Sequence, residues 1–103
     1  MIALQIAQII ADFVVFLELT DDDVLDPDDA VEMMEVLAGD LQALDKGFLR
    51  ELIDAFAVVA GECSGEVQEV VRNIAYYFYL EEELASDDPI RLAELEALRD
   101  ARI

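Results

Sequence analysis

The sequence predicts an all-α protein, a compact antiparallel bundle of four or five helices in one domain spanning residues 1–103. Apolar residues recur at helical spacing in five segments, and no segment shows the alternation typical of a strand. Pro27 and Pro89, the two prolines, each follow an aspartate at the start of such a segment, where helices commonly begin. A hydrophobic content of 56% argues against disorder. The lone cysteine, Cys63, excludes an internal disulfide and favours a cytoplasmic location.

The first predicted helix, residues 2–17, is the most apolar segment of the chain. Its few polar side chains form one narrow stripe of Gln5, Gln8 and Asp12. A helix that is apolar on nearly every face must be covered on nearly every face. We therefore expect either the central helix of the bundle or a partial dimer interface. The core residues expected here are Ile6, Ile10, Phe13 and Leu17.

A signal peptide or a membrane span is disfavoured for this first segment. It lacks a positively charged start, and its apolar run is shorter than the roughly 20 residues that a span needs. Acids rather than basic residues follow it. We therefore expect no membrane partner.

The second predicted helix starts after Asp26, which can cap it, with Pro27 as its first residue. Gly39 inside it should cost about 1 kcal/mol relative to alanine, which close packing or a kink could explain. The expected core stripe consists of Ala30, Met33, Met34, Leu37, Leu41 and Leu44.

Three further helices follow a short turn at 45–47. The third ends at Gly61, the fourth begins at Ser64, and the fifth begins at Asp88 and Pro89. The third should bury Leu49, Leu52, Ile53, Phe56 and Ala60. The fourth should bury Val67, Val70, Val71, Ile74 and Phe78. The fifth should bury Leu92, Leu95 and Leu98.

The charge is distributed unevenly along the chain. Residues 1–45 carry twelve carboxylates and no Lys, Arg or His, whereas the remaining 58 residues carry thirteen acids and six bases. The formal charge is therefore −12 in the first part and −7 in the second, which together give −19. Such a field repels nucleic acid and anionic membranes, and it attracts a basic protein and speeds its encounter. Helix capping and the helix dipole account for Asp26, Asp28 and Asp29, but not for Asp21, Asp22 and Asp23.

The run Tyr76-Tyr77-Phe78-Tyr79 is the second informative feature. On one continuous helix, Phe78 aligns with the core stripe, and Tyr76 and Tyr79 lie away from it. An exposed tyrosine pair beside carboxylates is typical of a protein-binding surface. The alternative is that a neighbouring helix covers Tyr76 as part of the core.

Enzymatic and cofactor chemistry has no candidate residues. The chain has no His, which removes the commonest general base and metal ligand, and Cys63 has no His to activate it. A calcium loop counted from Asp21 fails because Leu25 and Asp26 stand at its fifth and sixth positions. We therefore expect no catalytic residue, no metal site and no cofactor.

The chain resembles a known family in its size, its charge and one stretch. That stretch is Val24-Leu25-Asp26-Pro27-Asp28-Asp29-Ala30-Val31, continued by Met34, Leu37, Leu41 and Leu44. The resemblance is to the small acidic helical immunity proteins that bacteria make against their own secreted toxins. It implies a basic toxin partner, often a nuclease, whose active site or neighbouring exosite is covered. It transfers no individual binding residue.

The function expected from the sequence is therefore the binding and occlusion of a basic protein. The charge pattern and the helical wheel together select the partner-binding residues Asp21, Asp22, Asp23, Asp28, Glu32, Glu35, Glu69, Tyr76, Tyr79 and Glu83. Two alternatives remain open. One is a structural homodimer that buries the first helix, and the other is a nucleic-acid mimic that occupies a DNA-binding protein.

Overall fold

The structure, a computed structural model, describes residues 2–102, and the regular structure within that range is entirely helical. The prediction of an all-α fold is confirmed. The helices are α1 (Ile2–Leu19), α2 (Pro27–Gln42), α3 (Lys46–Gly61), α4 (Gly65–Arg72), α5 (Ile74–Tyr77), α6 (Leu80–Leu84) and α7 (Pro89–Ala101).

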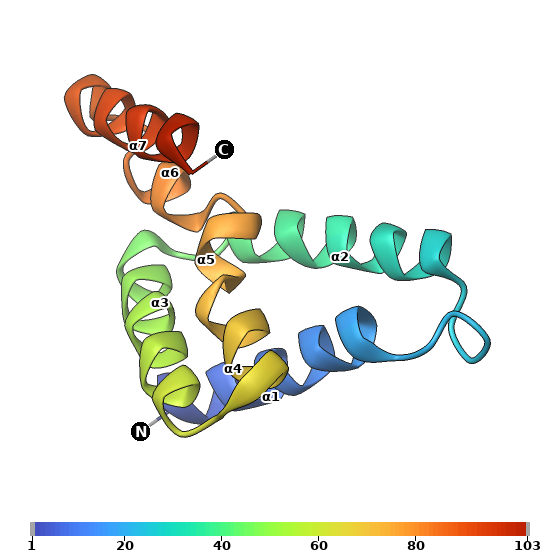
Figure 1. The fold of residues 1–103 in the computed structure, drawn as a ribbon. Coiled ribbons are helices and arrows are strands. Elements are labelled where there is room, and N and C mark those ends of the chain that lie inside the picture. The colour runs from blue at the N-terminus through green and yellow to red at the C-terminus, as the bar shows by residue number, and fades with distance from the viewer. Residues whose placement is uncertain (1, 103) are drawn as a thin grey trace.

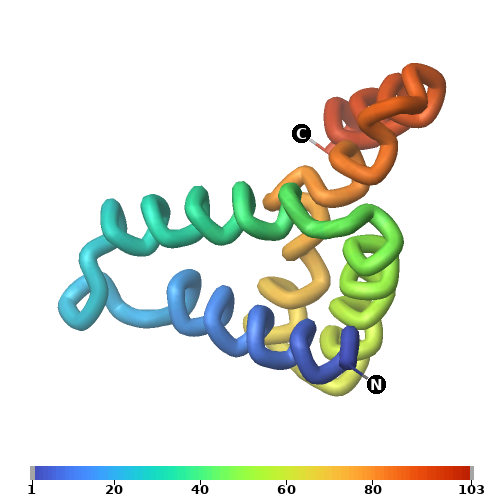
Figure 2. Tube along the Cα trace, turned by 180° about the vertical axis from the view of Figure 1, so that it is seen from behind, coloured from blue at the N-terminus to red at the C-terminus, as the bar shows by residue number. Residues whose placement is uncertain are grey.

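The fold contains two antiparallel sets of helices that cross each other. The long helices α1 and α2 run in opposite directions and are joined by the loop of residues 20–26 (Figures 1 and 2). Across their other end, α3 runs opposite to the series α4, α5 and α6. Helix α7 projects beyond α6, so the loop and α7 lie at opposite extremes of the molecule (Figure 1).

Aspartate side chains cap three helices, and the local sequence predicts two of these caps, Asp26 and Asp88. Asp26 accepts a hydrogen bond from the backbone N–H of Asp28 at 2.8 Å, and Asp88 accepts one from that of Arg91 at 3.1 Å. Asp45, which the sequence analysis assigned to a turn, caps α3 by accepting from Phe48 N–H at 3.1 Å.

Helix α3 is the centre of the core. It packs against α1 and α4, and all five of its predicted core residues are buried. The α5–α6 region adds three more buried side chains, Ile74, Phe78 and Leu80. The buried residues of α3 are Leu49, Leu52, Ile53, Ala55, Phe56, Val59 and Ala60.

The expected burial of α1 is confirmed for Leu17, holds only in part for Ile6 and Ile10, which pack against the core, and is wrong for Phe13. Leu17 is buried, Ile6 and Ile10 are half-buried, and 38% of Phe13 is exposed. The reason is that α1 turns its small side chains toward the core, where alanine lets two helices approach closely. The buried residues of α1 are Ala3, Ala7, Ala11, Val14 and Leu17. Helix α1 therefore lies at the edge of the core, and α3 takes the central place. By length and composition alone, α1 is long and apolar enough to cross a membrane, and 28% of its residues are buried in the fold.

The predicted fourth helix is divided into α4, α5 and α6. The first break is at Asn73, and the second is at Tyr79, whose backbone has the left-handed φ of 57°. A left-handed residue cannot continue a right-handed helix, so the helical wheel fails beyond this point. Three predicted core residues are also exposed, namely Met33, Val67 and Leu98.

The expected reason for Gly39 is wrong too. A Cβ at this position would meet nothing within 4 Å, so close packing does not require the glycine, and α2 runs unbroken through it.

Candidate functional site

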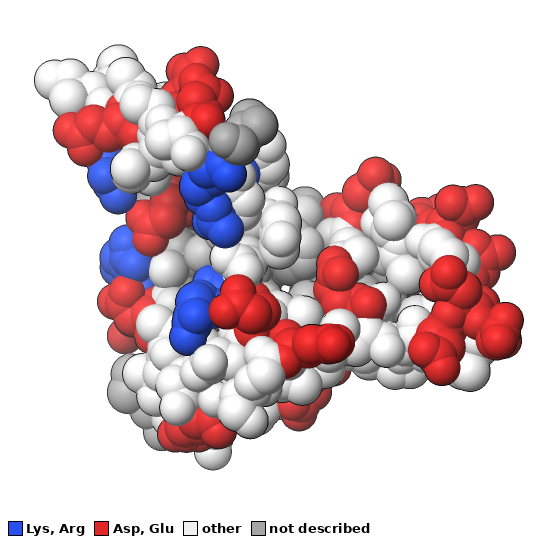
Figure 3. Space-filling view, viewed as in Figure 1, with Lys and Arg blue, Asp and Glu red and all other residues white. Residues whose placement is uncertain are grey.

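The largest unpaired charge lies on the acidic arm, which we define as residues 18–40: the end of α1, the loop and most of α2. Asp21, Asp22 and Asp23 project from the loop and are all exposed. On α2, Asp28, Glu32 and Glu35 are exposed and share one face, because they are four and three residues apart. Figure 3 shows this arm covered by acidic side chains, with no basic side chain on the visible part of it.

Within residues 2–102, five of the six basic residues form ion pairs, all with acids that follow Lys46 in the sequence. Lys46 pairs with Asp87 at 3.2 Å, and Arg50 pairs with Asp54 at 2.7 Å and with Glu81 at 3.0 Å. The other ion pairs are Arg72–Glu69, Arg91–Glu94 and Arg99–Glu82. Between residues 2 and 102, no carboxylate that precedes Lys46 takes part in an ion pair. The acidic arm therefore keeps a charge that the fold does not neutralise.

An open acidic hollow lies where α1 meets the loop. It has a volume of about 460 Å³, and Glu66 from the first turn of α4 is part of its lining. The carboxylates around it are Glu18, Asp21, Asp22, Asp23 and Glu66. They do not converge as metal ligands do, and in the described part of the chain no group of three such residues could hold an ion.

A narrower cleft of about 210 Å³ opens between α1, α2 and the α4–α5 segment. Its apolar lining comes from Val14, Met34, Val70, Ile74 and Phe78.

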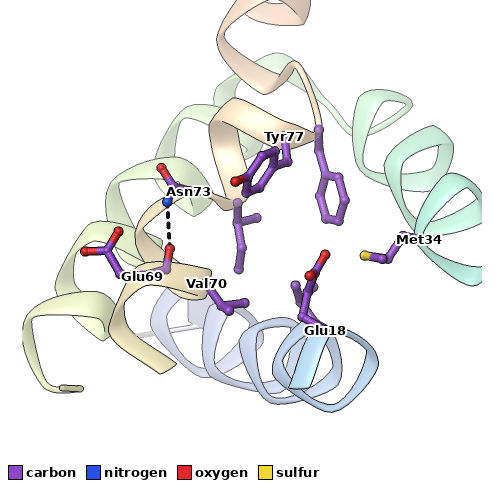
Figure 4. A pocket seen from close by; sticks show the side chains of 9 residues that line it. Glu18, Met34, Glu69, Val70, Asn73 and Tyr77 are labelled. Atoms are coloured by element: carbon purple, nitrogen blue, oxygen red, sulfur yellow. Dashed lines mark hydrogen bonds between the residues drawn. The ribbon is translucent and has the colours of Figure 1, made fainter. Parts of the chain in front are cut away.

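Three polar side chains, those of Glu18, Glu69 and Asn73, also line the cleft. Figure 4 shows Glu18 reaching into the cleft from α1, opposite Tyr77. Glu69 lies at the rim, where it pairs with Arg72 at 3.1 Å, and Asn73 donates to the Glu69 carbonyl at 2.9 Å. An apolar lining with a carboxylate suits a side chain that has an aliphatic stem and a cationic head.

Tyr76 and Tyr79, which were selected from the sequence as partner-binding residues, contact arginines of the same chain. The guanidinium of Arg99 lies 4.0 Å from the ring centre of Tyr76 and 3.9 Å from that of Tyr79. The guanidinium of Arg102 lies 3.6 Å from the Tyr76 ring centre. The structure therefore favours the alternative in which a neighbouring helix covers Tyr76. Tyr79 remains half exposed, as expected.

Arg99 is held by hydrogen bonds as well as by the rings. Its Nη2 donates to Glu82 and to the carbonyl of Tyr76, each at 2.8 Å, and its Nε donates to Glu82 at 3.1 Å. Partial burial lowers the pKa of Arg99, but the hydrogen bond and the negative charge of Glu82 outweigh this effect and raise it. Charged interactions of Arg99 therefore hold α7 against the α5–α6 region.

The predicted partner-binding residues thus fall into two groups, with Glu69 apart from both. The arm holds Asp21, Asp22, Asp23, Asp28, Glu32 and Glu35, all exposed and unpaired. The second group, Tyr76, Tyr79 and half-buried Glu83, lies at the α5–α6 joint, apart from the loop of the arm (Figure 1). Glu69 is exposed at the rim of the cleft.

Among the residues that line the cleft or the hollow and were not selected from the sequence are Glu18, Met34, Glu66 and Tyr77. Glu18 precedes the aspartate run by three residues, and that proximity was the only local signal. The other three reach these cavities through contacts between distant segments, which no local pattern reveals. Comparison of the chain with protein-family models, with curated proteins and with solved structures gave no match.

Proposed function

We propose that this protein binds a basic protein partner through its acidic arm and occludes it, as an immunity protein blocks a bacterial toxin. The observation that supports the proposal is the absence of an ion pair for any arm carboxylate in residues 2–102, while five of the six basic residues are paired elsewhere. Unpaired carboxylates on one side of a molecule cost stability through mutual repulsion. A cationic partner would remove that cost and would be steered to the arm.

The cleft gives the proposed contact an anchoring point. Steering by charge brings the partner to the arm, and burial of a side chain sets how long it stays. In this proposal, a Lys or Arg of the partner lays its aliphatic stem on Val14, Met34 and Ile74 and its charge beside Glu18. The exposed Tyr77 at this cleft replaces Tyr76 as the proposed aromatic contact.

The test begins with the reading frame beside the gene. A basic C-terminal domain encoded there should be toxic when expressed alone, and co-expression of this chain should restore growth. Absence of a toxic neighbour, or killing that co-expression leaves unchanged, would contradict the immunity proposal.

A matched pair of charge variants tests the arm itself. The arm variant carries Asp21→Asn, Asp22→Asn and Asp23→Asn. The control carries Glu51→Gln, Glu62→Gln and Glu96→Gln, which are exposed acids outside the arm and outside any ion pair in residues 2–102. Both variants lose the same net charge, so only a local effect separates them. We expect the arm variant to slow association with the toxic domain by about tenfold at low salt, and the control far less. Equally slow association of the two variants would show that the net charge alone, and not the position of the arm aspartates, attracts the partner.

The two adjacent tyrosines separate binding from folding. Tyr77→Ala should speed dissociation of the partner without lowering the melting temperature, because Tyr77 is 60% exposed. Tyr76→Ala should instead loosen α7, because it removes the ring that Arg99 and Arg102 contact. A partner complex indifferent to Tyr77→Ala would remove the cleft from the interface.

A further inference from the structure

Helix α1 has a second apolar face that no other segment between residues 2 and 102 covers fully. Its alanines lie in the core with Val14 and Leu17, while several other large side chains are exposed to solvent. The exposed fraction is 69% for Ile2, 68% for Ile9 and 49% for Phe16, with Phe13 beside them. Contiguous exposed apolar side chains of this size mark interaction surfaces in soluble proteins.

The spacing of these side chains is that of a helix-pairing seam. Ile2, Ile9 and Phe16 are seven residues apart, and Ile6 and Phe13 follow the first two at four residues. They occupy the d and a positions of a heptad repeat, through which two α-helices pair. Half-buried Ile6 lies at the border between this seam and the core. We call Ile2, Ile6, Ile9, Phe13 and Phe16 the α1 seam.

The charge around the seam selects the occupant. From Ile2 to Leu17, α1 has one ionisable side chain, Asp12, which accepts a hydrogen bond from Gln8 at 2.9 Å. A basic partner would find almost no carboxylate to pair with along this face. A second copy of this acidic chain can approach here, because this face lacks the carboxylates that repel it elsewhere.

We infer that the protein forms a homodimer in which α1 pairs antiparallel with α1 of a second copy through the α1 seam. The acids begin at Glu18, at the C-terminal end of α1. Antiparallel pairing places the two sets of Asp21, Asp22 and Asp23 at opposite ends of the interface, whereas parallel pairing would bring them together. It also sets the positive end of each helix dipole near Glu18 of the other copy.

The area of the seam is sufficient for a specific contact. Burying these side chains in both copies would remove on the order of 1,000 Å² of surface, near the lower limit for a specific interface. We expect dissociation on the order of micromolar concentration. The inference does not rest on the proposed basic partner, since the loop aspartates and α2 stay free in the dimer.

Sedimentation equilibrium of the full chain tests the dimer. Between 1 and 100 μM, the apparent mass should rise toward twice 11.5 kDa. The association should be unchanged or stronger in about 0.5 M NaCl, because apolar burial is not screened and charge repulsion is. A monomer over the whole range at both salt concentrations would overturn the inference. So would flotation of the monomer with phosphatidylcholine vesicles, which would make a membrane the occupant.

Two matched variants locate the interface. Ile9→Glu places a charge in the seam, and Val36→Glu places the same charge at an exposed apolar position of α2. Ile9→Glu should raise the dimer dissociation constant at least 100-fold while the far-UV circular dichroism spectrum remains helical. Val36→Glu should change it less than threefold. Equal weakening by the two variants would overturn the assignment to α1.

Oxidative cross-linking determines the orientation. In a Cys63→Ser background, Ile2→Cys alone should stay monomeric on non-reducing gels, because antiparallel pairing separates the two Ile2 positions by the length of α1. A mixture of Ile2→Cys with Thr20→Cys should give a covalent heterodimer. A covalent dimer from Ile2→Cys alone would overturn the antiparallel arrangement.

Discussion

Helices α2 and α3 are adjacent in the chain, each is sixteen residues long, and each begins at a capping aspartate, yet they do different work. Helix α3 buries seven residues and contacts most of the fold, whereas α2 buries only Ala30 and Leu41. Helix α2 contains five acids and no base; α3 contains two of each. The excess negative charge is therefore concentrated on α2, the helix that contributes little to the packing of the core. In our interpretation, α3 sets the stability of the fold and α2 is available for binding.

The largest expected difference concerns side-chain truncation. Leu52→Ala in α3 should cost about 2–5 kcal/mol of unfolding free energy, because Leu52 is fully buried and a cavity would remain. Val36→Ala in α2 should change it by less than about 0.5 kcal/mol, because Val36 is half exposed. Urea unfolding followed by far-UV circular dichroism measures both. Similar losses for the two would mean that α2 contributes as much to the core as α3.

The helix caps should separate global from local stability. Asp45→Ala should lower the global unfolding free energy by about 1 kcal/mol, because it removes the cap of the central helix. Asp26→Ala removes the equivalent bond of α2, but it should act mainly by letting α2 open locally. Hydrogen exchange should then show faster amide exchange confined to α2. Faster exchange in α3 as well would indicate that the two helices unfold as one unit.

Gly39→Ala should stabilise α2 by about 0.5–1 kcal/mol, since alanine is the better helix former and its Cβ meets no atom within 4 Å. The matched substitution Gly47→Ala in α3 should gain less, because its Cβ would lie 3.1 Å from Oδ2 of the capping Asp45. Slower amide exchange in α2 is the expected measurement. Destabilisation by Gly39→Ala would show that α2 bends at this position when the protein is free in solution.

The smallest effects come from single charges and have opposite signs in the two helices. Glu32→Gln in α2 should raise stability by a few tenths of a kcal/mol at low salt, since it relieves repulsion within the arm. Asp54→Asn in α3 should lower it by about 0.2–0.5 kcal/mol, since it breaks the ion pair with Arg50. Both changes should shrink in about 1 M NaCl, where charges are screened. Thermal unfolding at two salt concentrations measures both changes. If the arm carboxylates did not repel one another, both substitutions would change the stability in the same direction.

Local signals in the sequence predicted the fold class and much of its detail. The caps at Asp26 and Asp88 and the core of α3 follow from residue types at fixed spacing, and all are confirmed. The exposed arm also follows from sequence, because a segment with so many carboxylates and no base cannot bury them. These features depend on neighbours within one or two helical turns.

The remaining features depend on contacts between distant segments. In α1, apolar side chains cover two faces, and periodicity does not say which one the core uses; the alanines decided this by allowing close approach to α3. The docking of α7 on Tyr76 depends on Arg99, which is 23 residues away. The left-handed turn at Tyr79 lacks the glycine that normally announces one. The cleft also depends on contacts between distant segments, because three separate segments form it.

The three tyrosines occupy positions 76, 77 and 79, and the chain has no tryptophan. Tyrosine emission from this protein therefore originates at a single place, the joint against which Arg99 of α7 and the following Arg102 pack. Emission would follow the detachment of α7, whereas circular dichroism follows all the helices. Cooperative unfolding requires the two transitions to coincide. An earlier change in emission would identify α7 as a segment that leaves while the rest of the fold remains intact.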